Sequence, residues 1–229
     1  MIPLRDVIPS RTTPGVTVTL IALNVAIYFL QLMLTDRGRD ALLVGFGLIP
    51  AYFSLATVVT SMFLHGGIAH LAGNMLFLWI FGDNVEDRLG HGRFLFFYLL
   101  CGFVAAFAQT ALYPDSLVPM VGASGAIAGV MGAYLVLYPR SRVLMLFPFP
   151  LFLFELPAVV FLAMWFLVQF LNGINQLPVF EQDTVSGGVA FWAHVMGFVA
   201  GLILVVFMKR PERTRVEWWD TLGSQNSDL

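Results

Sequence analysis

Long apolar runs recur along this chain and constrain its fold more than any other feature. A helix needs about 20 residues to cross the hydrocarbon core of a bilayer. Six apolar stretches approach that length, at 17–35, 68–82, 94–112, 124–138, 153–171 and 190–208. Of the 229 residues, 59% are hydrophobic and 11% are charged, whereas soluble domains are roughly 45–50% apolar. We therefore predict an all-α, multi-pass integral membrane protein with six transmembrane helices.

The segment between the first two runs is less regular. Residues 50–82 begin at Pro50 and contain the adjacent Gly66 and Gly67, so they form either one long span or a buried loop followed by a short helix. Paired glycines favour the second interpretation. Irregular backbone at membrane depth is tolerated only where protein or a wet cavity covers it. We therefore expect residues 36–66 to form a loop that lies partly in the bilayer, against the bundle.

Basic residues predict the topology, because they concentrate on the cytoplasmic side of a membrane. A cytoplasmic N-terminus leaves only Arg37 and Arg39 outside. The basic residues that would lie inside are Arg5, Arg11, Arg88, Arg93, Arg140, Arg142, Lys209, Arg210, Arg213 and Arg215. This bias predicts a cytoplasmic N-terminus at 1–16, a six-helix core at 17–210 and a cytoplasmic tail at 211–229.

Charge and cysteine content exclude little else. The net charge is −2 and the isoelectric point is near 6.0, so nothing indicates a nucleic-acid partner. Cys101 is the only cysteine, which rules out a disulfide within the chain. We expect Cys101 to be a packing residue. The sequence leaves the oligomeric state open.

Two short clusters inside the apolar runs carry side chains suited to nucleophilic catalysis. Ser124 lies in G-A-S-G at 122–125, and His194 lies in A-H-V-M-G at 193–197. A serine and a histidine are the minimum parts of a nucleophile and its general base. An ionisable residue at the centre of a membrane helix costs on the order of 2.5–3.5 kcal/mol, so His194 needs a functional or structural reason.

Small residues around the two side chains would let their helices approach closely. Gly129 and Ala133 continue the stripe of the fourth run at four-residue spacing. The glycines that flank the pair are Gly122, Gly125, Gly197 and Gly201. Two alternatives stay open: Ser124 belongs to a packing stripe only, and His194 is a hydrogen-bonded structural histidine.

A third cluster, H-x-x-x-x-H-x-x-x-N at 65–74, adds further polar side chains. His70 and Asn74 are four residues apart, so on a helix they share a face and could form an oxyanion hole for a developing negative charge. His65 lies off that face and suits a structural hydrogen bond. A zinc site made from His65, His70 and His194 competes with this interpretation, but no H-E-x-x-H motif is present. The soluble hydrolase motif G-x-S-x-G is absent as well, because residue 126 is alanine.

Taken together, these clusters resemble the rhomboid family of intramembrane serine proteases. The resemblance is carried by G-A-S-G at 122–125, A-H-x-x-G-x-x-x-G at 193–201, the 65–74 cluster and V-E-D-R-L-G at 85–90. It implies Ser124 as the nucleophile, His194 as base and then acid, and an oxyanion hole of His70, Asn74 and the backbone N–H of Ser124. It also implies a six-helix core with a membrane-lying first loop, no cofactor and no metal.

The resemblance further implies a setting and a substrate class. A protein of this kind from a bacterium would lie in the inner (plasma) membrane and cut transmembrane segments of single-span proteins near the outer face. Glu86 and Arg88 would brace loops between the second and third spans; a solvated charged turn is the alternative. A family tyrosine that stacks on the histidine is replaced by Ala128, which leaves open what orients His194.

Several assignments remain undecided by the sequence. Trp165, Phe166 and Phe170 form either a lateral gate, together with the loop 172–189, or a lipid-facing surface. Acidic residues near His194 occur only in that loop, as Glu181 and Asp183, so a dyad without a carboxylate is the simplest interpretation. Rival functions are a non-catalytic rhomboid-like protein that binds transmembrane helices and a transporter or channel. Against a transporter, Asn24 and Glu155 do not make a polar pathway.

Overall fold

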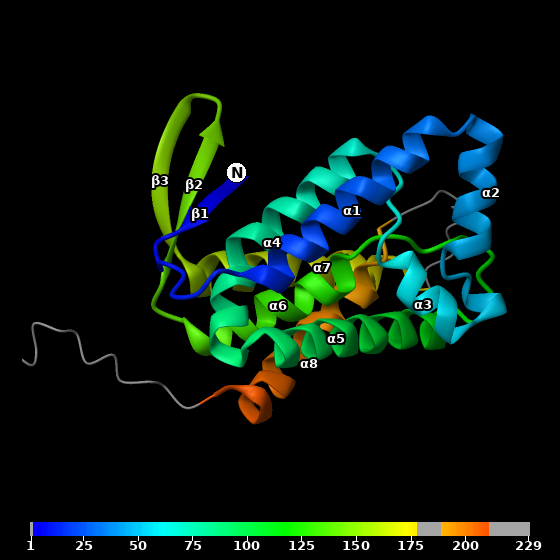
Figure 1. Ribbon diagram of the computed structural model, residues 1–229. Helices are drawn as coiled ribbons and strands as arrows, with labels where there is room; N and C mark the ends of the chain where they lie inside the picture. Colours follow the sequence, from blue (N-terminus) through cyan, green and yellow to red (C-terminus); the bar gives the residue numbers. More distant parts are fainter. Residues whose placement is uncertain (1, 178–188, 211–229) are drawn as a thin grey trace, which may run out of the picture.

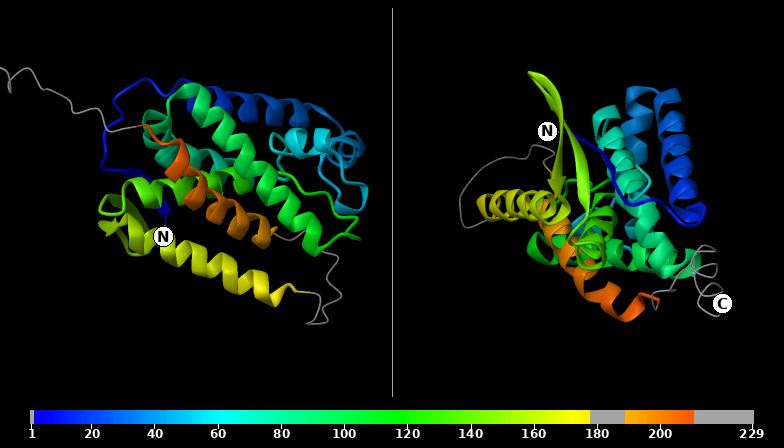
Figure 2. Two further views of the ribbon diagram at one scale, coloured as in Figure 1. Left: turned by 90° about the horizontal axis from the view of Figure 1, so that it is seen from below. Right: turned by 90° about the vertical axis from the view of Figure 1, so that its left-hand side faces the viewer.

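A computed structural model describes residues 2–177 and 189–210 of the chain. Its main body is a bundle of long helices (Figures 1 and 2). They are α1 (Gly15–Met33), α4 (Ile68–Leu89), α5 (His91–Leu112), α6 (Ser124–Leu137), α7 (Ala158–Asn175) and α8 (Phe191–Met208). The predicted helical membrane bundle is thereby confirmed.

Helix α6 lies at the centre of the bundle. It contacts α4, α5, α7 and α8, and every residue from Gly125 to Tyr134 is buried. Its most extensive contact is with α8. Among the residues that the structure describes, four helices, α1, α5, α7 and α8, are long and apolar enough to cross a membrane, while α6 is apolar but has only 14 residues. The number of spans, predicted as six, therefore stays a prediction.

The segment 36–66 is largely helical, so the expectation of a loop was wrong. It contains α2 (Asp36–Phe46), the short 3-10 helix η1 (Pro50–Tyr52) and α3 (Leu55–Ser61). The side chain of Thr35 accepts a hydrogen bond from the backbone N–H of Gly38 and so caps α2. Both η1 and α3 pack against α5, which matches the expectation that this segment lies against the bundle.

A three-stranded antiparallel sheet, which the sequence did not predict, lies at one end of the bundle. Its strands are β1 (Ile2–Asp6), β2 (Arg142–Pro148) and β3 (Leu151–Pro157), in that spatial order. The register pairs Ile2 with Leu146 and Arg142 with Pro157. The predicted fifth run, 153–171, therefore starts too early: its first residues belong to β3, and α7 begins at Ala158. An apolar strand and a buried helix cannot be distinguished by periodicity alone.

Basic side chains gather at the end of the bundle that carries the sheet. The backbone N–H of Arg210 donates to the carbonyl of Arg88, and Arg93 lies near the end of α8 through its contact with the carbonyl of Met208. Arg37 lies on α2, at the opposite end. The predicted topology likewise places these basic residues on one side of the membrane and Arg37 on the other, and the orientation itself stays a prediction. Arg213, Arg215 and the tail 211–229 lie outside the described residues.

Candidate active site

Ser124 and His194 meet between α6 and α8. Ser124 is the first residue of α6, and His194 lies in the first turn of α8. The Oγ atom of Ser124 is 2.7 Å from the Nε2 atom of His194, which is ordinary hydrogen-bond distance. The sequence separation of the two residues is 70, so the contact depends entirely on how the two helices pack.

Glycines hold the two helices in backbone contact. A Cβ atom added to Gly197 would lie 2.1 Å from the carbonyl oxygen of Gly125, and one added to Gly201 would lie 1.9 Å from that of Gly129. No side chain fits at either position. The expected stripe of small residues is therefore the contact surface that brings the serine and the histidine together.

Gln169 on α7 supplies the partner of the other imidazole nitrogen. Its Oε1 atom lies 2.8 Å from the Nδ1 atom of His194. A carbonyl oxygen only accepts, so Nδ1 carries the hydrogen and Nε2 presents its lone pair to the Ser124 hydroxyl. The Trp165 ring lies over the same imidazole, with centroids 5.9 Å apart and planes 35° apart. Gln169 and Trp165 are therefore the side chains that hold the His194 ring, since Ala128 offers it no stacking partner.

Sequence reasoning missed Gln169, although a signal for it exists. Gln169 is a polar residue in the middle of an apolar helix, and it follows Trp165 by four residues, so the two share a helix face. A polar side chain inside a membrane helix generally faces the protein interior and marks a functional site. The partner could not be named from the sequence, because it comes from a different helix.

Polar donors converge on the N-terminus of α6. Gly122 has φ +115°, a conformation that favours glycine. A Cβ atom there would lie 2.6 Å from the Nε2 atom of His70 and 3.5 Å from the Nδ2 atom of Asn74. The Asn74 amide nitrogen is buried and has no hydrogen-bond partner among the described residues. The backbone N–H of Ser124 belongs to the first turn of a helix, where N–H groups lack intrahelical partners.

These groups line one open cavity of about 1610 Å³. Its lining includes Ser124, His194, His70 and Asn74, together with Trp165. The cavity lies at the end of the bundle opposite the sheet, where α4, α6 and α8 begin. A serine hydroxyl, an imidazole and polar N–H donors therefore share one space that water can enter.

Comparison with known proteins assigns the family. The Rhomboid domain matches residues 52–211. The chain belongs to the rhomboid family. The family membership that the motifs predicted is thereby confirmed, and two of the relatives it matches are named rhomboid proteases.

Three relatives of this rhomboid illustrate the extent of the similarity. It is 38% identical to "Rhomboid protease GluP" of Bacillus subtilis (strain 168), over 56% of this chain and 26% of that one. It is 28% identical to "Rhomboid protease AarA" of Providencia stuartii, over 88% and 75%. It is 36% identical to "Rhomboid protein 1, mitochondrial" of Saccharomyces cerevisiae, over 42% and 29%. The rhomboid thus spans about a quarter of GluP and three quarters of AarA.

His65 lies behind the donors and is almost completely buried. The side chain of Gln31 brackets its backbone: Nε2 donates to the His65 carbonyl and Oε1 accepts from its N–H, both at 3.1 Å. The His65 ring meets the His70 ring edge to face, with centroids 5.0 Å apart. His65 thus supports the loop that precedes α4 and the position of His70. Within the described residues, no three histidine, cysteine or acidic side chains are grouped as metal ligands, so the geometry does not support the zinc hypothesis.

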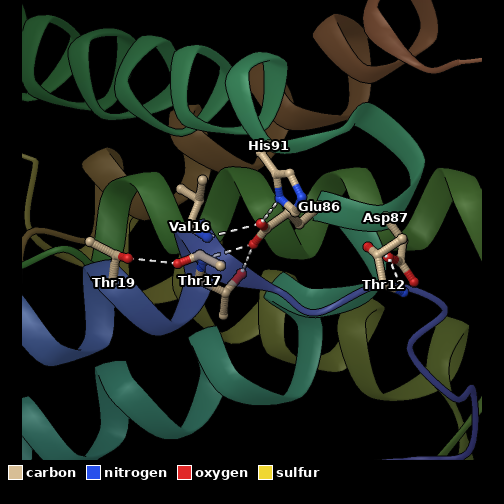
Figure 3. A network of polar contacts seen from close by, with 8 residues as sticks. Thr12, Val16, Thr17, Thr19, Glu86, Asp87 and His91 are labelled. Atoms are coloured by element: carbon tan, nitrogen blue, oxygen red, sulfur yellow. Dashed lines mark hydrogen bonds and ion pairs between the residues drawn. The ribbon is translucent and has the colours of Figure 1, made fainter.

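Glu86 and Arg88 lie far from the cavity, on the last turns of α4. The Glu86 side chain is buried and accepts hydrogen bonds from the backbone N–H groups of Val16 (2.9 Å) and Thr17 (2.7 Å) and from the Thr17 hydroxyl (Figure 3). Its carboxylate also contacts His91. A carboxylate at this position satisfies unpaired donors at the N-terminus of α1. Glu86 is therefore a buried brace and not part of a solvated charged turn.

Trp165, Phe166 and Phe170 of α7 each contact a ring on α8, although Phe170 is also partly exposed. The Phe166 ring lies 5.1 Å from that of Phe198, and the Trp165 ring lies 6.0 Å from it. Phe170 meets Trp192 edge to face at 5.9 Å. Of these side chains, Trp165 lines the cavity, and whether the three form a lateral gate stays a prediction. Glu181, Asp183 and most of the predicted loop 172–189 lie outside the described residues.

Proposed function

We propose that this rhomboid is a serine endopeptidase that cleaves transmembrane segments within the bilayer, with Ser124 as nucleophile and His194 as base. The observation that carries this proposal is the 2.7 Å hydrogen bond between Ser124 Oγ and His194 Nε2. It joins two helices at the cavity, and Gln169 holds the second imidazole nitrogen. This is the relation of nucleophile, base and orienting group that acyl transfer requires.

Acylation begins when the Ser124 oxygen attacks the carbonyl carbon of the scissile peptide. The hydroxyl proton passes to Nε2 of His194, and general-base assistance of this kind is worth about 10²- to 10⁴-fold in rate. The ring becomes an imidazolium whose Nδ1–H points at the Gln169 carbonyl oxygen. Gln169 is neutral, so the pair works without a carboxylate.

The peptide oxygen becomes an oxyanion as the tetrahedral intermediate forms. Asn74 Nδ2, His70 and the backbone N–H of Ser124 are the donors that surround this position. Losing one such donor typically costs about 10²- to 10³-fold in rate. When the intermediate collapses, the C–N bond breaks and the leaving amine takes the proton from His194. The product is an ester on Ser124.

Hydrolysis of that ester needs water. The open cavity of about 1610 Å³ gives water access to Ser124 from the end of the bundle where α6 begins. His194 takes a proton from the water as its oxygen attacks the ester, and then returns a proton to the serine oxygen. The serine and the neutral imidazole are restored, and no cofactor or metal enters the cycle.

The substrates follow from helix geometry. A continuous helix buries its carbonyl groups in intrahelical hydrogen bonds, so a peptide bond reaches Ser124 only where the helix unwinds. We expect single-span membrane proteins, cut near the outer face at a small residue, with Gly, Pro or polar residues just beyond the cut. Gly122 and Gly125 flank Ser124 in crowded surroundings, which favours a small side chain. A bacterial plasma membrane with both termini in the cytoplasm is the proposed setting.

The decisive experiment uses purified protein in liposomes with a model single-span substrate. We expect Ser124→Ala and His194→Ala to abolish cleavage while the melting temperature changes little, since both replacements are smaller. A fluorophosphonate probe should label wild-type protein at one residue and fail to label Ser124→Ala. Cleavage by either variant would contradict the dyad. A wild-type protein that neither cleaves nor reacts with the probe would favour a non-catalytic rhomboid that binds transmembrane helices.

A matched pair of substrates tests the unwinding step separately. The two differ only in the residues beyond the cut, which are helix-breaking in one and leucine in the other. We expect the leucine version to be cleaved more slowly. Equal rates would contradict the requirement for unwinding, and a cut at the cytoplasmic end would contradict the proposed topology.

A further inference from the structure

The hairpin of β2 and β3 is apolar on both faces. Every side chain from Val143 to Phe154 is apolar. Charged side chains occur only at the base of the hairpin, where Arg142 Nη1 lies 3.3 Å from Glu155 Oε2. An antiparallel sheet that borders water normally alternates apolar and polar residues, one face for each kind. This hairpin offers water no polar face.

Exposure rises from the base of the hairpin toward its tip. Val143 and Met145 are fully buried against the bundle. At the tip, Phe149 is 89% exposed and Leu151 is 75% exposed, and Leu153 on β3 is 57% exposed. Contiguous apolar surface of this kind marks a site of contact with a membrane or a partner. Something other than water therefore covers the tip.

The position of the hairpin identifies what covers it. β3 ends at Pro157 and α7 begins at Ala158, with no linker between them. The hairpin runs across the end of the bundle rather than along its helices, and its tip extends beyond the side of the bundle (Figures 1 and 2). Because the helices cross the bilayer, a hairpin in this position lies along the membrane surface, at the level of the helix ends. Its apolar surface continues into the exposed Val159 and Val160 of α7.

We propose that the β2–β3 hairpin lies in the boundary between headgroups and acyl chains of the leaflet at the basic end, with residues 147–152 in contact with lipid acyl chains. The hairpin then anchors the start of α7, the helix that carries Gln169. This surface is separate from the cavity, and the proposal does not depend on proteolysis.

Spin labels on single cysteines test the placement in liposomes. Cys101, the only native cysteine, is fully buried, so labelled wild-type protein measures the background. Labels go on Phe149→Cys and Leu151→Cys. The aqueous control is Ser10→Cys, at an exposed polar position near the same end, and the lipid control is Phe107→Cys, at an exposed position of α5. Collision rates with oxygen, which partitions into lipid, are compared with those of a water-soluble nickel complex.

We expect the ratio of oxygen to nickel accessibility at both tip positions to exceed that of the Ser10 control and to approach that of the Phe107 control. A ratio equal to that of the Ser10 control would overturn the proposal, because the tip would then lie in water. Protection from both reagents, with dipolar broadening that disappears on dilution with unlabelled protein, would also overturn it. In that case a second copy of the chain would cover the hairpin.

Discussion

Replacement of Gln169 by leucine tests how the base is oriented. Leucine is close to glutamine in size but cannot accept the hydrogen bond from Nδ1 of His194, which is 2.8 Å from Oε1 in the native structure. The contact of Trp165 with the imidazole is left in place. The variant therefore removes one polar interaction from the reacting group with little change in packing volume.

The magnitude follows from the charge that the ring acquires. A neutral hydrogen bond contributes about 0.5–1.5 kcal/mol, whereas a bond to a charged group contributes about 1.5–3 kcal/mol. The hydrogen bond between His194 and Gln169 should therefore become stronger by about 1–2 kcal/mol when the imidazole becomes an imidazolium. Only this gain accelerates the reaction. At about 1.36 kcal/mol per tenfold change, kcat should fall about 5- to 30-fold in Gln169→Leu, with a smaller change in KM.

The assay is cleavage of a transmembrane substrate in liposomes, read as kcat and KM over a range of pH. Asn172→Leu is the matched control, because Asn172 lies on the same helix and its side chain bonds to Val168 within that helix. Gln169→Glu keeps the acceptor and adds a charge that stabilises the imidazolium, so the acidic limb of its kcat/KM profile should move to higher pH. Unchanged kcat in Gln169→Leu, or an unshifted profile in Gln169→Glu, would refute the orienting role.

Three further predictions concern packing, protonation and metal. Gly201→Ala should destabilise the protein by about 1–3 kcal/mol, seen as a lower melting temperature in detergent, because the Cβ atom of the new alanine would lie 1.9 Å from the Gly129 carbonyl oxygen. The control is Gly92→Ala, since a Cβ atom at Gly92 would have nothing within 4 Å. Equal effects of the two substitutions would contradict the packing argument. Burial raises the pKa of Asp6 from 3.8 to about 6, so the folded state binds its proton more tightly than the unfolded state. The melting temperature of wild-type protein relative to Asp6→Asn should therefore be highest below about pH 4 and fall as the pH rises through 6, and a constant difference would be inconsistent with this. Activity should survive EDTA and phenanthroline, and loss of activity that zinc restores would indicate a metal site.

The contact between Ser124 and His194 could be predicted because its signal is local. G-A-S-G at 122–125 and the glycines after His194 are visible as short patterns, and their four-residue spacing already indicates two helices in close contact. The structure gives that spacing its physical meaning, since the Gly197 and Gly201 backbones touch the backbone of α6. The pairing of His70 with Asn74 was visible for the same reason, because both lie on one helix face.

The parts that escaped prediction depend on contacts between distant segments. The sheet joins residues 2–6 to residues 142–157, and an apolar run such as that at 153–157 has the same composition whether it pairs as a strand or continues a helix. Gln169 reaches His194 from another helix. The resemblance already implied that Glu86 is a brace, but its partner, the N-terminus of α1, is known only from the structure.

The placement of Gln169 on α7 links His194 to the helix whose Trp165 lines the cavity. Helix α8 rests on α6 through glycine backbones, whereas α7 contacts α8 through side chains, such as the Phe166 ring 5.1 Å from that of Phe198. Outward movement of α7 would therefore break the Gln169 contact and leave the Ser124–His194 hydrogen bond between the two other helices. The ring would then lose the acceptor that keeps the proton on Nδ1. Because Ala128 on α6 provides no stacking ring, the side chains that hold the imidazole from its other side, Gln169 and Trp165, both come from α7, and we expect the orientation of His194 to depend on the position of α7.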